Sequence, residues 1–328
     1  MASHRKKQSD IDSLNRFWKS HSWTTPLSLL VAVLLATPSP VLRRFVFLSY
    51  KDGEDDLYGK GAWDLAFVAF YTLVLSVTRE LVMQEILLPL ARTWGLRSRR
   101  KQQRFMEQAY TVVYFGILGP VGVYVMRSTP VWYFNTRGMY ELYPHRMHSA
   151  AVKGYYLLQA AYWAQQALVM VLGLERPRRD YAELVGHHLV TLALIALSYR
   201  FHFVYIGLAV YLTHDISDFF LAMSKCMLYV NSIAAPPMYL FTLLSWIYLR
   251  NYQNLRILVS LVTEFRTVGP YTLDWAAEQY KCGLSNAVTL VLLSALQGLN
   301  LFWLAALLRN LYRYVVYRVA KDDRSDDE

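Results

Sequence analysis

The sequence predicts an all-α protein, a polytopic bundle of transmembrane helices. Hydrophobic residues make up 55% of the chain and the mean hydropathy is +0.20, which is too apolar for an ordinary soluble domain. Apolar segments close to the roughly 20 residues that cross a bilayer as a helix recur along almost the whole chain. No strand alternation persists, and helices satisfy their backbone groups within lipid. We therefore expect one membrane domain, residues 26–318, between a polar segment, 1–25, and an acidic tail, 319–328.

Eight segments are candidates for spanning helices. They cover residues 26–48, 62–88, 108–126, 151–173, 182–199, 203–222, 235–249 and 285–308. Pro38 and Pro40 interrupt the first segment, since proline breaks helices, and the seventh segment is short. The prediction is therefore seven or eight spans.

Charge predicts the orientation of these spans. The net charge is +10, but the basic residues lie between apolar segments and not on one face, which argues against nucleic acid as a partner. The densest basic cluster lies within residues 91–106, and acidic residues gather at 52–56. Because loops rich in Lys and Arg stay in the cytosol, we expect 91–106 and both termini to be cytosolic. Cys226 and Cys282 then lie on opposite sides of the membrane, so no disulfide is expected.

Ionisable and polar side chains cluster around the fifth and sixth predicted spans. The cluster comprises Arg178, Arg179, Asp180, Glu183, His187, His188 and Thr191, followed by His214, Asp215, Ser217, Asp218 and Lys225. Ionisable groups inside a membrane are costly, so a functional role with a named partner is the first hypothesis for them.

The depths of the histidines match. His187 lies 14 residues before the turn near residue 201, and His214 lies 13 residues after it. At about 1.5 Å per residue, both lie about 20 Å from that turn. Two antiparallel helices joined by so short a turn pack together, so the two histidines are expected to meet in the cytosolic third of the membrane.

Helical spacing separates the faces of these two spans. Residues three or four apart share a face, which places His187 on a polar stripe with Glu183 and Thr191, and leaves His188 at its edge. On the next helix His214, Ser217 and Asp218 share a face. Asp215 is rotated from that face by about 100°.

Several interpretations of these residues stay open. The histidines could be satisfied packing residues or part of an ion pathway. A metal site is disfavoured because spacings such as His-Glu-x-x-His are absent, and a serine hydrolase because no Gly-x-Ser-x-Gly turn is present. Arg79 is expected to pair with Glu80 or to reach a phosphate. His145 and His148 fall in a predicted lumenal loop and are expected to be solvated.

The residues resemble the ceramide synthases, a branch of the TLC-domain membrane proteins. The resemblance rests on Arg178-Arg179-Asp180, His187-His188, Thr191, Ser198-Tyr199, Gly207, His214-Asp215, Ser217-Asp218 and Lys225. Outside this signature, Phe47-Leu48-Ser49-Tyr50, Pro144-His145-Arg146 and the stretch from Trp246 to Arg313 look like fungal members. The chain lacks the homeobox-like insert of many animal members, which suits a fungal form.

The resemblance implies a multi-pass enzyme of the endoplasmic reticulum membrane that transfers a fatty acyl group from acyl-CoA to the amine of a sphingoid base. His187 is then the expected general base or the nucleophile of a covalent acyl-imidazole route, with His188 and His214 assisting. Asp215 or Asp218 would orient the imidazole. The expected substrate-binding residues are Arg178, Arg179, Ser217, Thr191 and Arg79.

Further expectations follow from the same resemblance. Acyl-CoA is a substrate, and no cofactor or metal is expected. Very-long-chain acyl groups are implied, with residues 250–284 as the candidate region for chain-length choice. A small single-span accessory subunit and a homo-oligomer are the implied protein partners, alongside membrane lipid. Ser325 precedes three acids and is similar to an acidophilic kinase site, or it belongs to a solvated acidic tail.

Two other classes of function remain. A non-catalytic TLC protein that senses lipids or accompanies a translocon would form no product. A transporter would move substrate across sealed vesicles without forming product.

Overall fold

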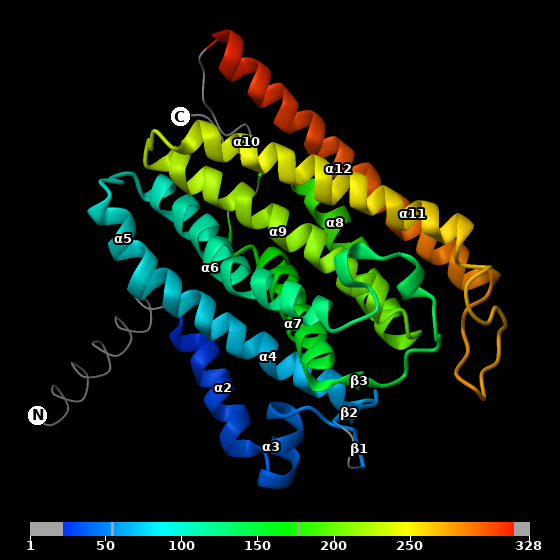
Figure 1. Ribbon diagram of the computed structural model, residues 1–328. Coiled ribbons are helices and arrows are strands. Elements are labelled where there is room, and N and C mark those ends of the chain that lie inside the picture. The colour runs from blue at the N-terminus through cyan, green and yellow to red at the C-terminus, as the bar shows by residue number, and fades with distance from the viewer. Residues whose placement is uncertain (1–21, 54–55, 176–177, 318–328) are drawn as a thin grey trace, which may run out of the picture.

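The computed structural model describes residues 22–53, 56–175 and 178–317, which form a bundle of long helices (Figure 1). The helices are α2 (Thr24–Ala36), α3 (Ser39–Val46), α4 (Trp63–Leu81), α5 (Leu88–Thr93), α6 (Arg99–Arg127), α7 (Ala150–Val171), α8 (Tyr181–Arg200), α9 (Val204–Tyr229), α10 (Ala235–Ser245), α11 (Asn254–Thr263) and α12 (Gly283–Tyr317). Three two-residue strands, β1 (Lys51–Asp52), β2 (Leu57–Tyr58) and β3 (His148–Ser149), pair antiparallel at one end of the bundle. The predicted all-α class is confirmed.

Two π-helical segments join shorter helices into continuous rods. Val82–Leu87 links α4 to α5, and Trp246–Gln253 links α10 to α11. The first has a local cause, because Pro89 lacks the N–H that the carbonyl of Glu85 would accept in a regular α-helix. The second lies beside the cluster of histidines and has no proline within it.

Five helical rods among the described residues are long and apolar enough to cross a membrane. They are Trp63–Thr93, Arg99–Arg127, Tyr181–Arg200, Val204–Tyr229 and Gly283–Tyr317. Helix α7 is more polar, but its Lys153, Gln159 and Gln165 are buried inside the bundle. The chain is therefore a multi-pass membrane protein, and the count of seven or eight spans stays a prediction.

Several predicted boundaries were wrong. Residues 26–48 form two helices, because the chain breaks at Thr37 and restarts after Pro38 with Pro40 in the first turn of α3. The seventh helix continues through the π-helical segment to Thr263, so the loop before α12 is only 264–282. Of the predicted N-terminal segment 1–25, residues 1–21 lie outside the described residues. The predicted tail 319–328, which contains Ser325, lies entirely outside them.

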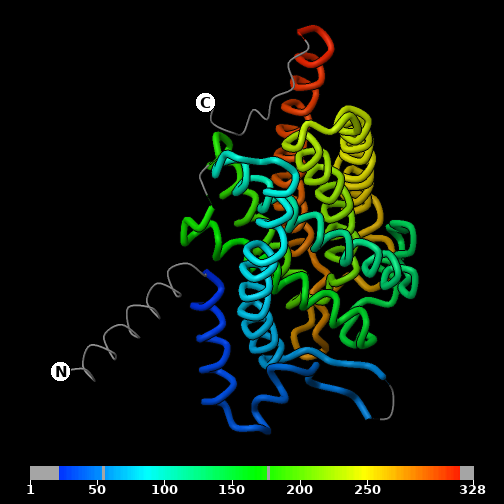
Figure 2. Tube along the Cα trace, turned by 90° about the vertical axis from the view of Figure 1, so that its left-hand side faces the viewer, coloured from blue at the N-terminus to red at the C-terminus, as the bar shows by residue number. Residues whose placement is uncertain are grey.

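The arrangement of the rods places α9 in the interior. Helix α9 packs along α6 on one side and α10 on another, and α8 lies between α7 and α12 (Figures 1 and 2). Figure 2 shows α2 on the outside of the bundle and the end of α12 projecting beyond the other helices. The hydrophobic core runs through α6, α7 and α9, whose buried aromatic rings stack on one another, as Tyr114 and Tyr162 do at 3.7 Å between centroids.

A buried ion pair fixes the helices at the strand end. Lys153 of α7 contacts Asp64 of α4 at 2.7 Å and donates to the carbonyls of Ser49 and Gly59 at 2.9 and 2.6 Å. Tyr199 of α8 donates to the same carboxylate at 2.8 Å. Because both charges are buried and fully paired, this cluster holds α4, α7 and α8 in one register.

Candidate active site

Two cavities meet at His187. The polar cavity, about 270 Å³, is lined by charged and amide side chains, among apolar and aromatic ones, from α6 to α9, the α10–α11 rod and α12. Its polar members include Gln108, Gln166, Glu175, Arg178, Asp180, His188, Asp218 and Arg250. The apolar cavity, about 220 Å³, lies on the other side. Only His187 and Trp163 line both cavities, so the imidazole lies where a polar and an apolar part of one ligand would join.

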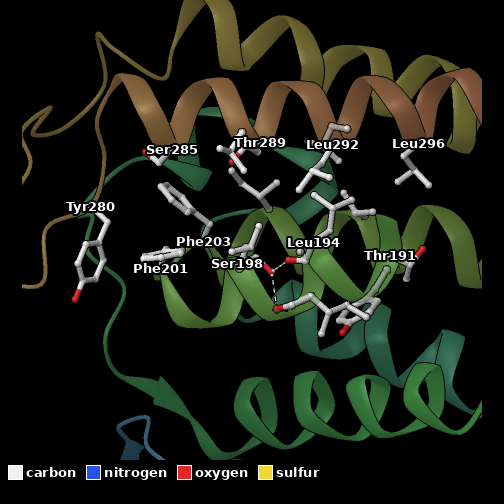
Figure 3. A pocket seen from close by; sticks show the side chains of 18 of the residues that line it. Thr191, Leu194, Ser198, Phe201, Phe203, Tyr280, Ser285, Thr289, Leu292 and Leu296 are labelled. Carbon is white, nitrogen blue, oxygen red and sulfur yellow. Dashed lines mark hydrogen bonds between the residues drawn. The ribbon is translucent and has the colours of Figure 1, made fainter. Parts of the chain in front are cut away.

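The apolar cavity is a slot between α8 and α12. Figure 3 shows Leu194 of α8 facing Leu292 of α12 across it, with Ser198 on the α8 side and Tyr280 of the 264–282 loop at the far end. Apart from the imidazoles of His187 and His214, the thiol of Cys282 and a few hydroxyls, its walls are hydrocarbon and aromatic. Such a slot suits an alkyl chain, because its burial is favoured by about 0.8 kcal/mol per methylene.

His187 is held between aromatic rings. Its imidazole lies edge-on to Trp163 at 5.7 Å and to Trp303 at 5.4 Å between centroids, and it stacks on His214 at 6.3 Å. The contact with His214 is the one that the turn length and helix rise predicted. The residue is 5% exposed, and its Nδ1 has no hydrogen-bond partner among the described residues.

Backbone carbonyls set the tautomers of the other two histidines. Nδ1 of His214 donates to the carbonyl of Val210 at 2.9 Å, and Nδ1 of His188 donates to that of Leu184 at 2.9 Å. In each ring Nε2 is then the acceptor. The Nε2 of His214 faces the amide of Asn300 at 3.5 Å.

The two aspartates do not contact the imidazoles among the described residues. Asp215 accepts a hydrogen bond from Tyr155 at 3.1 Å and another from Gln159, both on α7. Asp218 pairs with Arg250 at 2.6 Å. The direct orienting role expected for these carboxylates is therefore not seen, because the rotation of Asp215 turns it toward α7 and an arginine reaches Asp218 first.

Arg250 organises the buried face of α9. Its Nε donates to Ser217 Oγ at 2.6 Å, one amino group reaches Asp218, and the guanidinium lies 4.1 Å from the centre of the Trp246 ring. The same arginine donates to the backbone carbonyl of His214 at 3.3 Å. Arg250 thus links the π-helical segment to the histidine-bearing turn of α9.

Comparison with known proteins identifies the family of this chain. The TLC domain family matches residues 104–309, which contain all of these side chains. The chain is 52% identical to the sphingosine N-acyltransferase-like protein FUM17 of Gibberella moniliformis, over 94% of this chain and 83% of the relative. It is 47% identical to the sphingosine N-acyltransferase lac1 of Schizosaccharomyces pombe (94% and 82% covered) and 45% identical to the ceramide synthase LAG1 of Saccharomyces cerevisiae (98% and 82% covered). The chain belongs to the ceramide synthase family. It is an acyltransferase.

This ceramide synthase places only some of the expected substrate-binding residues at a cavity. Thr191 lines the apolar cavity and Arg178 the polar one. Arg179 lines a third, larger groove between α9, α10 and α12. Ser217 is fully buried, lines none of the three, and holds Arg250 instead. Arg79 is 3% exposed, lines none of the three, and is held by Glu80 and by Glu175, the latter at 2.6 Å.

Sequence reasoning missed four residues of the ceramide synthase site. They are Trp163, Arg250, Asn300 and Trp303. For Arg250 a signal existed, because Asn254, Ile257 and Leu261 continue a buried helical face beyond the predicted end of the seventh span at 249. The other three look like ordinary interior residues of a helix, and only the tertiary arrangement brings them to His187.

Proposed function

We propose that this chain transfers a fatty acyl group from acyl-CoA to the amine of a sphingoid base such as dihydrosphingosine or phytosphingosine, forming a ceramide and free CoA. The names of the relatives support this reaction. The observation that carries it is the position of His187 between a polar and an apolar cavity, which matches a thioester linking a polyanionic head to a hydrocarbon tail.

The chemistry needs a group that moves one proton. The amine nitrogen attacks the thioester carbonyl, the C–S bond breaks, and the proton lost by the amine ends on the thiolate sulfur. As general base His187 would carry that proton, with His188 and His214 assisting. In the alternative route His187 attacks first, CoA leaves, and the amine then takes the acyl group from the imidazole. Asp218 and Asp215 would act indirectly, through Arg250 and through Tyr155 with Gln159.

The two ends of acyl-CoA would bind in different cavities. Arg178 lines the polar cavity, where its guanidinium group can hold a phosphate. The acyl chain would lie in the apolar cavity toward Leu273, Trp275 and Tyr280 of the 264–282 loop.

We propose that this loop limits the chain length and admits very-long-chain groups. The substitution Trp275→Ala should then shift the products toward longer chains, measured by mass spectrometry with mixed acyl-CoA substrates.

The cellular setting is part of the same proposal. We place the protein in the endoplasmic reticulum membrane with both termini in the cytosol, on the side where acyl-CoA is found. The basic side chains at the start of α6, Arg99, Arg100 and Lys101, support this orientation. A single-span accessory subunit and a homo-oligomer remain proposed partners. No cofactor beyond the acyl-CoA substrate is proposed.

Product formation tests the proposal. Purified protein in detergent should convert very-long-chain acyl-CoA and dihydrosphingosine into ceramide, and omission of either substrate should abolish the product. Absence of ceramide, both alone and after co-expression with an accessory subunit, would favour a non-catalytic TLC protein. Movement of substrate across sealed vesicles without product would favour a transporter.

A further inference from the structure

One carboxylate at the polar cavity has an oxygen without a partner. Asp180 is 9% exposed and lines both the polar cavity and the neighbouring groove. Its Oδ2 accepts a hydrogen bond from the indole N–H of Trp303 at 2.9 Å, and its buried Oδ1 has no hydrogen-bond partner among the described residues. A buried carboxylate oxygen is costly to leave unpaired, so this atom indicates a site for a donor that comes from outside the chain.

The Asp180 side chain does not cap the helix that it precedes. Asp180 is the N-cap residue of α8, a position where an aspartate side chain normally accepts a hydrogen bond from the first turn of its own helix. Here the side chain makes no such bond. The carboxylate is turned away from the helix end and is held by Trp303 of α12 instead.

The other acids of the polar cavity already have cationic partners. Glu175 pairs with Arg79 at 2.6 Å and with Arg178 at 3.8 Å, and Asp218 pairs with Arg250 at 2.6 Å. Among the described residues no cation lies within salt-bridge distance of Asp180, which shares the cavity with His187 and His188. Trp303 contacts both Asp180 and the ring of His187, which places the carboxylate one side chain away from the reacting imidazole.

We infer that Asp180 binds the ammonium group of the sphingoid base and positions the amine next to His187. This inference rests on the proposed function and assigns its amine substrate to a residue. The neighbouring groove, about 980 Å³, opens from Asp180 along Leu228, Leu240 and Leu307 and provides apolar walls for the long chain of the base. Charge-assisted hydrogen bonding to Oδ1 would select a cationic lipid. The ammonium group then releases one proton to solvent, and the neutral amine attacks the thioester.

Basic side chains also line that groove, so the alternative is that it binds an anionic group. Arg179, Lys225, Arg309 and Arg313 suit an anionic head group better than a cationic one. If Asp180 only balances these charges, its removal would change the affinity for acyl-CoA and not the affinity for the amine. The test must therefore measure both substrates separately.

Asp180→Asn is the most direct variant, because the amide oxygen still accepts from Trp303 while the charge is lost. With saturating acyl-CoA, the KM for dihydrosphingosine should rise about ten- to hundredfold, as expected for loss of a charge-assisted hydrogen bond. The KM for acyl-CoA should not change. Asp56→Asn is the matched control, since it removes the same charge from an exposed carboxylate that pairs with Lys51 and lines none of the three cavities. It should leave both KM values unchanged, and Asp180→Glu should give an intermediate KM for the amine.

A competition experiment tests the charge of the amine directly. N,N-dimethyl-dihydrosphingosine is a cation that cannot form an amide, and its analogue with a hydroxyl in place of the amine is neutral. The cation should inhibit the wild-type enzyme more strongly, and Asp180→Asn should remove that difference. Equal inhibition of the wild type by both compounds, or an acyl-CoA effect alone in the variant, would overturn the inference. If the wild type forms no ceramide, it is the proposed function that fails.

Discussion

At the residue scale, the site depends on side chains that hold other side chains. The imidazole of His214 is fixed by the carbonyl of Val210 and faces Asn300, while Asp218 on the same helix pairs with Arg250. The guanidinium of Arg250 is 2% exposed, so its fork of donors replaces the water that would otherwise solvate Asp218 and Ser217. Arg250 is therefore the residue whose loss should disturb the site most without removing a histidine.

The first prediction concerns this arginine. Arg250→Met leaves the carboxylate of Asp218 without its cation and should lower the free energy of unfolding by about 3 kcal/mol, measured as a fall in melting temperature in detergent. The double variant with Asp218→Asn should recover part of that loss. Arg250→Lys should be intermediate, because an ammonium group cannot reproduce the fork. Equal melting temperatures for the wild type and Arg250→Met would contradict the assigned role.

At the element scale, the helices of the bundle pack closely where a glycine replaces a larger side chain. Gly122 of α6 lies against α7 and α9, where an added Cβ would come within 2.3 Å of the Tyr155 hydroxyl and 2.6 Å of a Leu212 methyl. Gly298 of α12 has nothing within 4 Å of the corresponding position. Substituting Gly122 therefore tests helix packing, whereas substituting Gly298 tests helix propensity alone.

The second prediction uses this pair. Gly122→Ala should destabilise the protein by about 1–3 kcal/mol, because Tyr155 and Leu212 must move and Tyr155 also holds Asp215. Gly298→Ala should be neutral or slightly stabilising, since alanine favours a helix over glycine by up to about 1 kcal/mol. Thermal unfolding of both variants measures the difference. A higher melting temperature for Gly122→Ala than for Gly298→Ala would contradict the packing described for α6.

The third prediction concerns pH and the strand-end loops. The expectation that His145 and His148 are solvated was wrong, since they are 8% and 2% exposed. Burial, with Lys60 nearby, lowers the pKa of His148 to about 2 from the ordinary 6.5. The unfolded chain then binds a proton below pH 6.5 that the folded chain does not, so the stability contributed above pH 6.5 is lost progressively as the pH falls. His148→Leu should reduce the fall in melting temperature between pH 7 and pH 5, and an unchanged fall would contradict the burial of a neutral His148.

Local patterns predicted some of these elements and missed others for physical reasons. The turn between α8 and α9, together with the helix rise, was enough to pair His187 with His214, because those constraints act along a short stretch of chain. The partners of Asp215 were not predictable in that way, since Tyr155 and Gln159 lie on α7 and face it only after the bundle forms. Residues 250–263 were mistaken for loop because their polar side chains, such as Asn251 and Asn254, are satisfied by Gln297 of α12 and not by water.

At the scale of the whole molecule, the bundle provides different environments on the two sides of one histidine. The polar cavity lies at the end where α8 begins, and the apolar cavity extends toward the opposite end, where the 264–282 loop closes it. A membrane enzyme that joins two long-chain substrates needs this division, because the head group must stay hydrated while the chain stays in hydrocarbon. Substitutions in the polar cavity should therefore change the affinity for the head group, and substitutions in the apolar cavity should change the chain length of the product.

The most direct test of the account is ceramide synthesis by His187→Ala compared with the wild type. Both proteins would be purified in detergent, and equal melting temperatures would show that the variant is folded. Ceramide formed from acyl-CoA and dihydrosphingosine would be measured by mass spectrometry. Loss of a general base or nucleophile should lower kcat by at least about a hundredfold. Wild-type kcat in a folded His187→Ala protein would contradict the assignment of acyl transfer to this histidine.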